Sequence, residues 1–330
     1  NRATCDSRVV ELTLQAPSAL RSDSMNLLLN PKNLRRRDFI HLSAMAGGAF
    51  AFGQLARATK AISQRRPIIG FSKPFQNMAA GEMVDFISTI GWDGIECPVR
   101  AKGQIEPEHA LDQLPGITEV FRKNRKDIFI VATDITSLQQ KYAENVLRAV
   151  SKSGIKRVRL GFFKYDPKRP PQEHLDALRP VIKDIADACK ELGLQAGIEN
   201  HSGRDLVGAP VWDLYSLIKD IDPQHMGICF DIGHATIEGG LSWPIQARLM
   251  EPFFTAVYVK DFVWRKDGNR WREDWVQLGK GMVNREFIDR LKNSSFDGPI
   301  CQHHEYELGN RAEMAERMRQ DLRVLRSWLA

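Results

Sequence analysis

The sequence contains few of the features that identify several common classes of protein. Five cysteines occur in 330 residues and no two form a Cys-x-x-Cys pair, so neither a thiol redox motif nor a disulfide framework is indicated. No Gly-x-Gly-x-x-Gly motif follows the first strand-like run, which argues against an open dinucleotide-binding sheet. No internal repeat occurs after residue 66, and no arginine cluster or glycine-rich loop is present to hold a phosphate group.

The cysteines that are present lie in apolar surroundings. Cys97, Cys229 and Cys301 lie in strand-like runs, Cys189 lies in a helical pattern, and Cys5 lies near the start of the chain. Such residues behave as small buried apolar groups, and we predict free thiols rather than disulfides.

Basic charge is concentrated at the start of the chain. Residues 1–58 hold 8 of the 47 Lys and Arg residues and 4 of the 41 Asp and Glu residues, so the remainder has a net charge of +2. No long basic stripe is left in that remainder. We therefore expect no nucleic-acid partner.

The order of residues near the start predicts an export signal. Arginines at 35–37 precede Asp38, Phe39 and Ile40, an uncharged apolar run covers 42–52, and Ala-Arg-Ala follows at 56–58. This order resembles a twin-arginine signal over residues 25–60, and it predicts an exported protein of the periplasm or the extracellular space. An amphipathic N-terminal helix is the alternative. The apolar run is too short for a stable bilayer span, so we expect no membrane anchor.

Residues 1–24 precede Met25, a suitable first residue for such a signal. We interpret them as an over-extended reading frame or an uncleaved tail, outside the folded domain.

Strand-like and helical patterns alternate from residue 66 to residue 330. The eight predicted strands are residues 68–72, 94–99, 128–133, 157–162, 195–200, 226–231, 255–261 and 299–305. Eight such units in about 265 residues predict an α/β fold, a (β/α)8 TIM barrel that forms a single domain. The longest irregular stretch, residues 262–282, follows the seventh strand and would lie at the active rim.

Carboxylates and imidazoles follow two successive predicted strands. The run at 197–201 reads Gly-Ile-Glu-Asn-His, and the run at 229–234 reads Cys-Phe-Asp-Ile-Gly-His. The carboxyl ends of barrel strands meet at one rim, where the active sites of TIM barrels lie. Residues two apart on a strand face the same way, so the pairs expected to point together are Glu199 with His201, Tyr258 with Lys260, and His303 with Glu305.

Five segments resemble the xylose isomerase-like TIM-barrel superfamily, and within it the sugar phosphate isomerase/epimerase group. They are residues 91–96, 198–201, 230–235, 259–261 and 278–281, which read GWDGIE, IENH, FDIGHA, VKD and LGKG. The resemblance implies a divalent metal held by Glu, Asp, His and Glu at the ends of strands five to eight. It also implies that the two Glu residues move substrate protons.

Two positions depart from that pattern. Glu199 and Asp231 match the first two ligands, but Tyr258 stands where the family often has His, and His303 stands where many members have Glu. We predict that Glu199, Asp231 and His303 bind manganese, magnesium, zinc or cobalt, and that Glu305 or water completes the shell.

The predicted catalytic residues are Glu199, Lys260 and Glu305. If metal is weakly held, Lys260 is the predicted base, because an amine in a partly apolar rim beside other cations loses its proton more easily. The predicted substrate contacts are His201, His234, Asp261, Glu96, Lys164 and Trp264.

Structural alternatives stay open for several of these residues. Glu199 is alternatively a strand-end carboxylate paired with an arginine, Lys260 and Asp261 a plain ion pair, and His234 a helix-capping or core histidine. Glu96 and Lys164 are alternatively solvated rim residues, and the tryptophans near Trp264 alternatively pack beneath their loop.

The predicted function is a metal-dependent isomerase or epimerase of a non-phosphorylated sugar, which acts through an enediolate. A metal-dependent lyase or dehydratase, for instance one that eliminates from a 3-keto glycoside, shares the same first step and is the first alternative. A non-catalytic sugar-binding barrel is the second. Endonuclease members of the superfamily have more histidines than the eight found here. The expected partner is a small carbohydrate, and the oligomeric state is left open.

Overall fold

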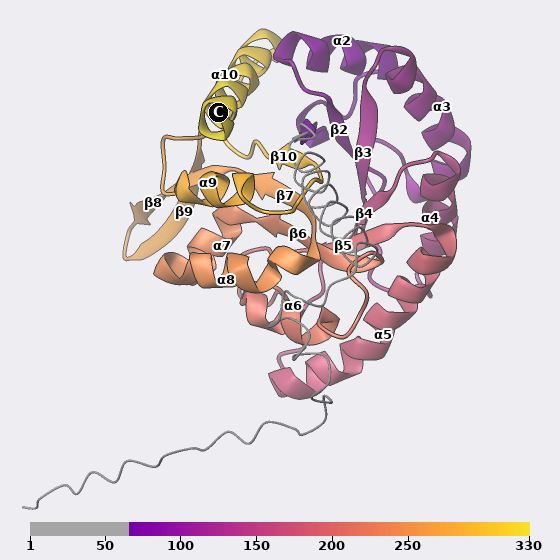
Figure 1. Cartoon of the computed structure of the whole chain (residues 1–330), viewed down its shortest axis with the longest axis vertical. Helices are drawn as coiled ribbons and strands as arrows, with labels where there is room; N and C mark the ends of the chain where they lie inside the picture. The colour runs from indigo at the N-terminus through magenta and orange to yellow at the C-terminus, as the bar shows by residue number, and fades with distance from the viewer. Residues whose placement is uncertain (1–65) are drawn as a thin grey trace, which may run out of the picture. The chain divides into compact units, whose positions relative to one another are not determined.

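The computed structural model describes residues 66–330, so the predicted export signal and the segment before it lie outside the described residues. A closed barrel of parallel strands forms the centre of the described part, with helices around it (Figure 1). The predicted (β/α)8 barrel is confirmed. Its strands are β1 (Ile68–Phe71), β2 (Gly94–Pro98), β3 (Asp127–Ala132), β4 (Arg157–Arg159), β5 (Gln195–Glu199), β6 (Met226–Asp231), β7 (Phe254–Val259) and β10 (Ile300–Gln302).

The helices follow the strands in the alternation that the sequence predicts. They are α2 (Ala80–Ile90), α3 (Ala110–Lys123), α4 (Ala143–Lys152), α5 (Pro171–Leu192), α6 (Val211–Ile218), α7 (Ile232–Gly239), α8 (Trp243–Met250), α9 (Glu286–Lys292) and α10 (Arg311–Leu329). The short helix α7 is absent from the sequence-based assignment. It begins directly after β6 because the Asp231 side chain caps it by accepting the His234 amide at 2.9 Å.

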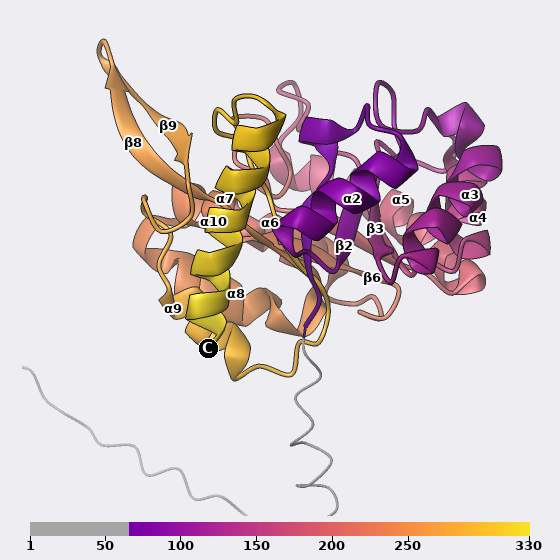
Figure 2. The ribbon, with the colours of Figure 1, turned by 90° about the horizontal axis from the view of Figure 1, so that it is seen from above.

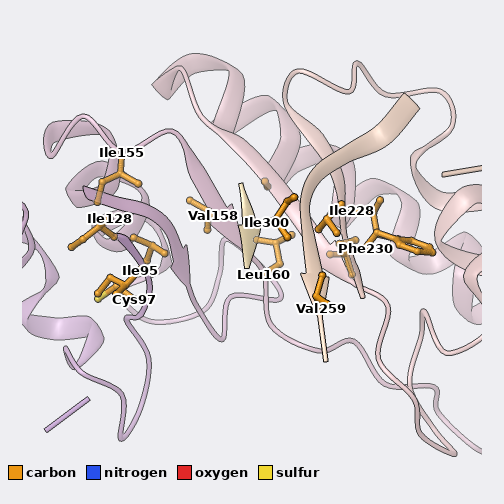
Figure 3. Packing of buried hydrophobic residues seen from close by; sticks show 14 of the residues in the cluster. Ile95, Cys97, Ile128, Ile155, Val158, Leu160, Ile228, Phe230, Val259 and Ile300 are labelled. Carbon is orange, nitrogen blue, oxygen red and sulfur yellow. The ribbon is translucent and has the colours of Figure 1, made fainter. Parts of the chain in front are cut away.

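Apolar side chains pack on both faces of the strands. Outside the barrel, residues such as Ile95, Ile128 and Phe230 pack between the strands and the helices (Figure 3). A smaller cluster inside the barrel includes Ile69 and Ile130. The four cysteines of the described residues are free and buried, as their apolar context predicts.

The stretch after β7 is more regular than the sequence indicates. Strands β8 (Asp261–Asp267) and β9 (Arg270–Val276) form an antiparallel hairpin that stands out from the body of the barrel (Figure 2). The turn between them is Gly268-Asn269, and Gly268 has a φ of 60°, a conformation that suits a two-residue hairpin turn. Away from the barrel both strands are exposed and carry tryptophan and charged residues, which conceals the strand pattern.

The helices between residues 66 and 330 include none with both the length and the apolar character needed to cross a bilayer.

Candidate active site

An arginine at the end of β4 joins two carboxylates at the rim of the barrel. The Arg159 Nε donates to Glu96 Oε1 at 2.7 Å, and its Nη1 donates to Glu199 Oε2. The Tyr258 hydroxyl donates to Glu96 Oε1 at 3.0 Å, and His303 Nε2 lies 3.1 Å from Glu96 Oε2. Burial opposes ionisation of Glu96, but Arg159 and the His303 contact lower its pKa to about 2. We call Glu96, Arg159 and Glu199 the arginine cluster.

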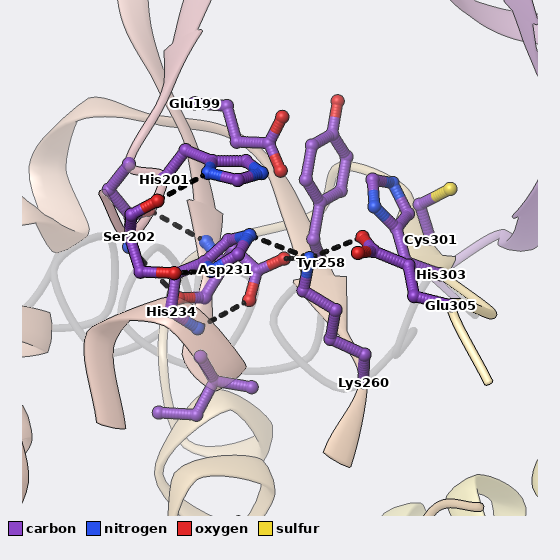
Figure 4. Close-up of polar contacts among 12 residues, drawn as sticks. Glu199, His201, Ser202, Asp231, His234, Tyr258, Lys260, Cys301, His303 and Glu305 are labelled. Atoms are coloured by element: carbon purple, nitrogen blue, oxygen red, sulfur yellow. Dashed lines mark hydrogen bonds and ion pairs between the residues drawn. The ribbon is translucent and has the colours of Figure 1, made fainter. Parts of the chain in front are cut away.

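A lysine directly after β7 forms the second group of charges (Figure 4). The Lys260 Nζ lies 2.7 Å from Glu305 Oε1, 2.7 Å from His234 Nε2 and 3.2 Å from Asp231 Oδ2. It also lies 4.4 Å from the ring centre of Trp275. Burial alone lowers the pKa of Lys260, but Asp231 and Glu305 outweigh it, and the pKa is raised. The side chain is therefore an ammonium, and we call Lys260 with its three polar partners the lysine cluster.

The lysine cluster fixes the state of His234. Burial and the neighbouring Lys260 hold the pKa of this imidazole well below its usual value, so the ring is neutral. Its Nε2 accepts from Lys260, which leaves Nδ1 to donate to Ser202 Oγ at 2.8 Å. The His201 ring lies 3.8 Å from the His234 ring, between it and Phe162.

Asp231 is held from both sides. Asn200 accepts the Asp231 amide at 2.8 Å and donates to the Asp231 carbonyl at 2.9 Å, which ties the end of β6 to the end of β5. The carboxylate Oδ1 caps α7, but the buried Oδ2 accepts no hydrogen bond, and Lys260 reaches it only as an ion pair. Burial raises the pKa of Asp231 despite the opposing effect of Lys260.

Glu305 covers the lysine. Its side chain is 37% exposed, whereas that of Lys260 is 2% exposed. It borders two open surface pockets of about 520 and 610 Å³, one beside Phe71 and the other beside Trp275. Burial opposes its ionisation, but Lys260 lowers the pKa of Glu305 to about 2. A molecule that enters from solvent must move Glu305 before it touches the ammonium.

The predicted metal ligands fall into two groups. Glu199, Asp231 and His234 offer donor atoms that all lie within 4.8 Å of one another, and Glu96, Cys301 and His303 form a second such group. The structure thus brings together two of the three predicted ligands and gives them His234 in place of His303. The set of Glu199, Asp231 and His303 stays a prediction.

The first of these groups does not suit a divalent ion as it is arranged. The Lys260 ammonium already lies 2.7 Å from His234 Nε2 and 3.2 Å from Asp231 Oδ2, the two atoms that an ion would need. The Arg159 guanidinium holds one oxygen of Glu199. Like charges in one buried site repel strongly, so an ion would have to displace an ammonium that its own neighbours stabilise.

The structure corrects the chemistry expected for Lys260. A deprotonated Lys260 was expected from neighbouring cations, but its nearest charged neighbours in the folded chain are Asp231 and Glu305. Its pKa therefore moves up rather than down. Lys260 donates its hydrogen bonds here as an ammonium, so the expected lowering of its pKa is wrong, whereas its catalytic role stays a prediction.

Asp261 has a structural role. Its carboxylate accepts the amides of Phe262, Gly279, Gly281 and Val283 at 2.9 Å each, which uses the acceptor positions that a carboxylate offers. This closes the chain after the hairpin. A Cβ on Gly281 would lie 2.2 Å from the Phe262 carbonyl oxygen, which explains the glycine. The ion pairs of Lys260 are with Asp231 and Glu305, not with Asp261, and the predicted substrate contact of Asp261 stays a prediction.

Of the other residues predicted to contact substrate, some lie in the site and some lie outside it. His201 and His234 lie in the site, whereas Glu96 is fully buried beneath it and bonded by Arg159. Lys164 lies on the loop after β4, where it forms an isolated bridge with Leu206. Trp264 lies on the hairpin with 42% of its surface exposed.

Three residues of the site escaped the sequence reasoning. Arg159 and Ser202 bind predicted residues directly. Trp275 packs edge-on against His234 at 5.4 Å and under Lys260, and so takes the aromatic place expected of Trp264. The only signal for Trp275 was its position in the stretch after the seventh strand.

Comparisons with known proteins agree with this architecture. The sequence model of the family described as xylose isomerase-like TIM barrel matches residues 84–328. An uncharacterized protein of Methanocaldococcus jannaschii is 29% identical over 130 residues, which are 39% of this chain and 43% of that protein. The chain thus matches less than half the length of this relative.

Two solved structures have the same fold at low sequence identity. A xylose isomerase-like TIM-barrel protein from Mycobacterium smegmatis, in complex with magnesium, aligns with a TM-score of 0.60 at 18% identity, over 81% of this chain and 98% of that one. The apo form of 3-keto-D-glucoside 4-epimerase from E. coli aligns with a TM-score of 0.61 at 16% identity, over 79% of this chain and 100% of that one. One barrel fold supports many reactions, so the reaction must be argued from the site.

Proposed function

Because the chain belongs to the xylose isomerase-like TIM-barrel family, we propose that it is a carbohydrate isomerase or epimerase that moves a proton at a carbon next to a carbonyl. The observation that carries this proposal is the buried Lys260 ammonium, with the carboxylate of Glu305 at 2.7 Å and on its solvent side. An electrophile and a base side by side are what enolisation requires.

The reaction begins when the substrate carbonyl oxygen replaces Glu305 on Lys260. Glu305 then loses the partner that lowers its pKa, and it becomes a stronger base at the moment when the substrate arrives. It removes the proton from the carbon next to the carbonyl, and the negative charge that develops on the oxygen is stabilised by Lys260. Return of the proton to the other face of the same carbon gives epimerisation. Return to the neighbouring carbon gives isomerisation, in which the hydroxyl proton of the substrate passes to the former carbonyl oxygen and the deprotonated oxygen becomes the new carbonyl.

The remaining residues hold this pair in place. Asp231 and His234 fix the ammonium from the barrel side, and Ser202 and Asn200 fix them in turn. The Trp275 ring shields one side of the ammonium from water. Side chains that are held before the substrate binds need no reorganisation during the reaction, which is the main source of electrostatic stabilisation in enzymes.

Deuterium exchange tests the proposal. The purified protein is incubated in deuterated water with a panel of ketoses and 3-keto glycosides, and the substrates are examined by NMR. Deuterium at the carbon next to the carbonyl, with no loss of a group, supports an isomerase or epimerase. Release of an aglycone supports the lyase alternative, and no exchange with any substrate rejects both.

A substitution at Glu305 tests the assignment of the base. We expect Glu305→Gln to slow exchange by about 10²-fold or more, because an amide cannot accept the proton. Glu191→Gln, an exposed carboxylate at the end of α5, is the control and should exchange at the wild-type rate. Equal rates in both variants would transfer the role of base to another carboxylate.

Export by the twin-arginine route is part of the proposal. The paired arginines, the short apolar run and the small residues after it support it. We expect the full chain to reach the periplasm of a bacterial host, and Arg36→Lys with Arg37→Lys to retain it in the cytoplasm. Cell fractionation measures both.

A further inference from the structure

The rim of this barrel contains two cations that belong to the chain itself. We propose that Lys260 and Arg159 are the resident cations of the site, and that they take the place of a divalent ion. The inference depends on the proposed function only for the role given to Lys260. The occupancy of the site by side chains is a separate claim and is measured separately.

Lys260 contacts the atoms that an ion would need. A divalent ion binds carboxylate oxygen and imidazole nitrogen at about 2.0–2.2 Å. Asp231 Oδ2 and His234 Nε2 are atoms of their group that could bind an ion, and the Lys260 Nζ lies 3.2 and 2.7 Å from them. An ion bound to both atoms would lie within a few Å of the ammonium. At that distance two like charges repel by several kcal/mol even in a medium of intermediate dielectric.

Arg159 engages the third donor. Its guanidinium bridges Glu199 and Glu96, and its side chain is 3% exposed. The rings of Phe71 and Tyr258 lie 5.2 and 5.9 Å from it, so it cannot turn to solvent without breaking these contacts. An ion bound through the other oxygen of Glu199 would lie beside this buried guanidinium, and the two like charges would repel.

The two positions that depart from the family pattern belong to the arginine cluster. Tyr258 donates its hydroxyl to Glu96 at 3.0 Å, so this hydroxyl is used as a donor. His303 stacks between Phe71 at 5.0 Å and Tyr258 at 4.2 Å, and its Nε2 contacts Glu96. Both side chains therefore contact the carboxylate of Glu96 on β2. The two departures from the family pattern, Tyr258 and His303, and the buried cation Arg159 therefore all contact the same carboxylate, that of Glu96.

Manganese binding tests the proposal. Wild type, Lys260→Met and the exposed control Lys280→Met are dialysed against chelator and titrated with Mn²⁺, with binding followed by electron paramagnetic resonance. Metal analysis of the wild type as purified accompanies the titration. We expect no stoichiometric metal in the wild type, deuterium exchange that survives the chelator, and Mn²⁺ binding at least about tenfold tighter in Lys260→Met than in either other protein.

Two results would overturn the proposal. One is about one equivalent of metal in the purified wild type, lost together with activity on chelation. The other is equal Mn²⁺ affinity in Lys260→Met and wild type. Lys260→Gln provides a second neutral variant if Lys260→Met does not fold, and circular dichroism checks each protein. If exchange is absent in the wild type but the Mn²⁺ results are as expected, the proposed function fails and this inference stands.

Discussion

Two buried polar groups in this molecule have opposite protonation states, although burial favours the neutral form in both. In the arginine cluster, Arg159 and the His303 contact lower the pKa of Glu96 to about 2 although burial opposes it. In the group formed by His304, Tyr306 and Asp321, which lies beneath α10 and includes Asp321 from its buried face, burial raises the pKa of Asp321 to about 7 and lowers that of His304 to about 3. The Glu96 carboxyl is therefore charged near neutral pH. In the second group, the His304 imidazole is neutral and the Asp321 carboxyl is partly protonated at that pH.

The difference lies in the partners and not in the degree of burial. Glu96 is bonded by a guanidinium, whereas Asp321 Oδ2 accepts a neutral Tyr306 hydroxyl at 2.7 Å and lies 3.4 Å from His304 Nε2, with no hydrogen bond between them. Permanent charge in a barrel interior requires a matched cation, and without one burial determines the protonation state. A buried group that stays charged under these conditions is well suited to catalysis.

Removing the cation of the lysine cluster should have the largest effect. We expect Lys260→Met to lower kcat/KM by about 10³-fold or more, because the variant lacks the group that stabilises the developing oxyanion. Lys260→Arg, which keeps the charge but changes its shape, should recover part of the loss. Steady-state kinetics on the substrate found by deuterium exchange, with Lys280→Met as the control, measures both. Equal rates in Lys260→Met and the control would remove Lys260 from the mechanism.

Removing Arg159 should leave the arginine cluster without a cation, which is the situation of the group beneath α10. We expect Arg159→Met to lower the free energy of unfolding by about 3–5 kcal/mol, because Glu96 and Glu199 are then left as uncompensated buried charges. The double variant Arg159→Met with Glu199→Gln should recover part of this loss. Urea unfolding followed by circular dichroism measures it, and a change below about 1 kcal/mol would mean that the bridge contributes little.

In the group beneath α10, a change of pH creates the uncompensated buried charge that the arginine substitution creates in the arginine cluster. The folded pKa of Asp321 is above its usual value, so the folded state keeps a proton that the unfolded state loses, and stability falls as pH rises from about 4 to about 7. We expect Asp321→Asn to remove this loss and to be more stable than wild type at pH 8 by about 2 kcal/mol. Thermal unfolding across this pH range, with the exposed Asp220→Asn as control, measures the effect. Parallel pH profiles for Asp321→Asn and wild type would show that Asp321 ionises normally.

The sequence predicted the barrel and the two strand ends that carry Glu199 and Asp231. Apolar runs of period two, separated by helical patterns, are a local signal, and the carboxyl end of a strand is a position that a sequence reveals. The alternative of an arginine partner for Glu199 is confirmed by Arg159. The partner itself was not predictable, because Arg157 and Arg159 lie two apart on β4 and face the same way, and nothing local says which of them reaches a carboxylate.

The state of Lys260 could not be predicted from the sequence either. Its pKa depends on Asp231, Glu305 and Glu199, which come from the end of β6, the loop after β10 and the end of β5. Three-dimensional proximity alone decides whether its neighbours are cations or carboxylates. The place of Trp275 in the site was not predictable either, because the hairpin strands lack the alternation of apolar and polar residues that identifies a half-buried sheet.

The lysine at the rim is attached to the backbone of the chain, and this has a consequence for the life of the protein after synthesis. An ion can be lost by dilution, exchanged for a rival or taken by a scavenger, whereas a tethered amine accompanies the polypeptide wherever it is delivered. Such a centre needs no loading step and no supply from its surroundings. In return its reach is limited to one side-chain length, so only ligands that present their oxygen at that depth can use it.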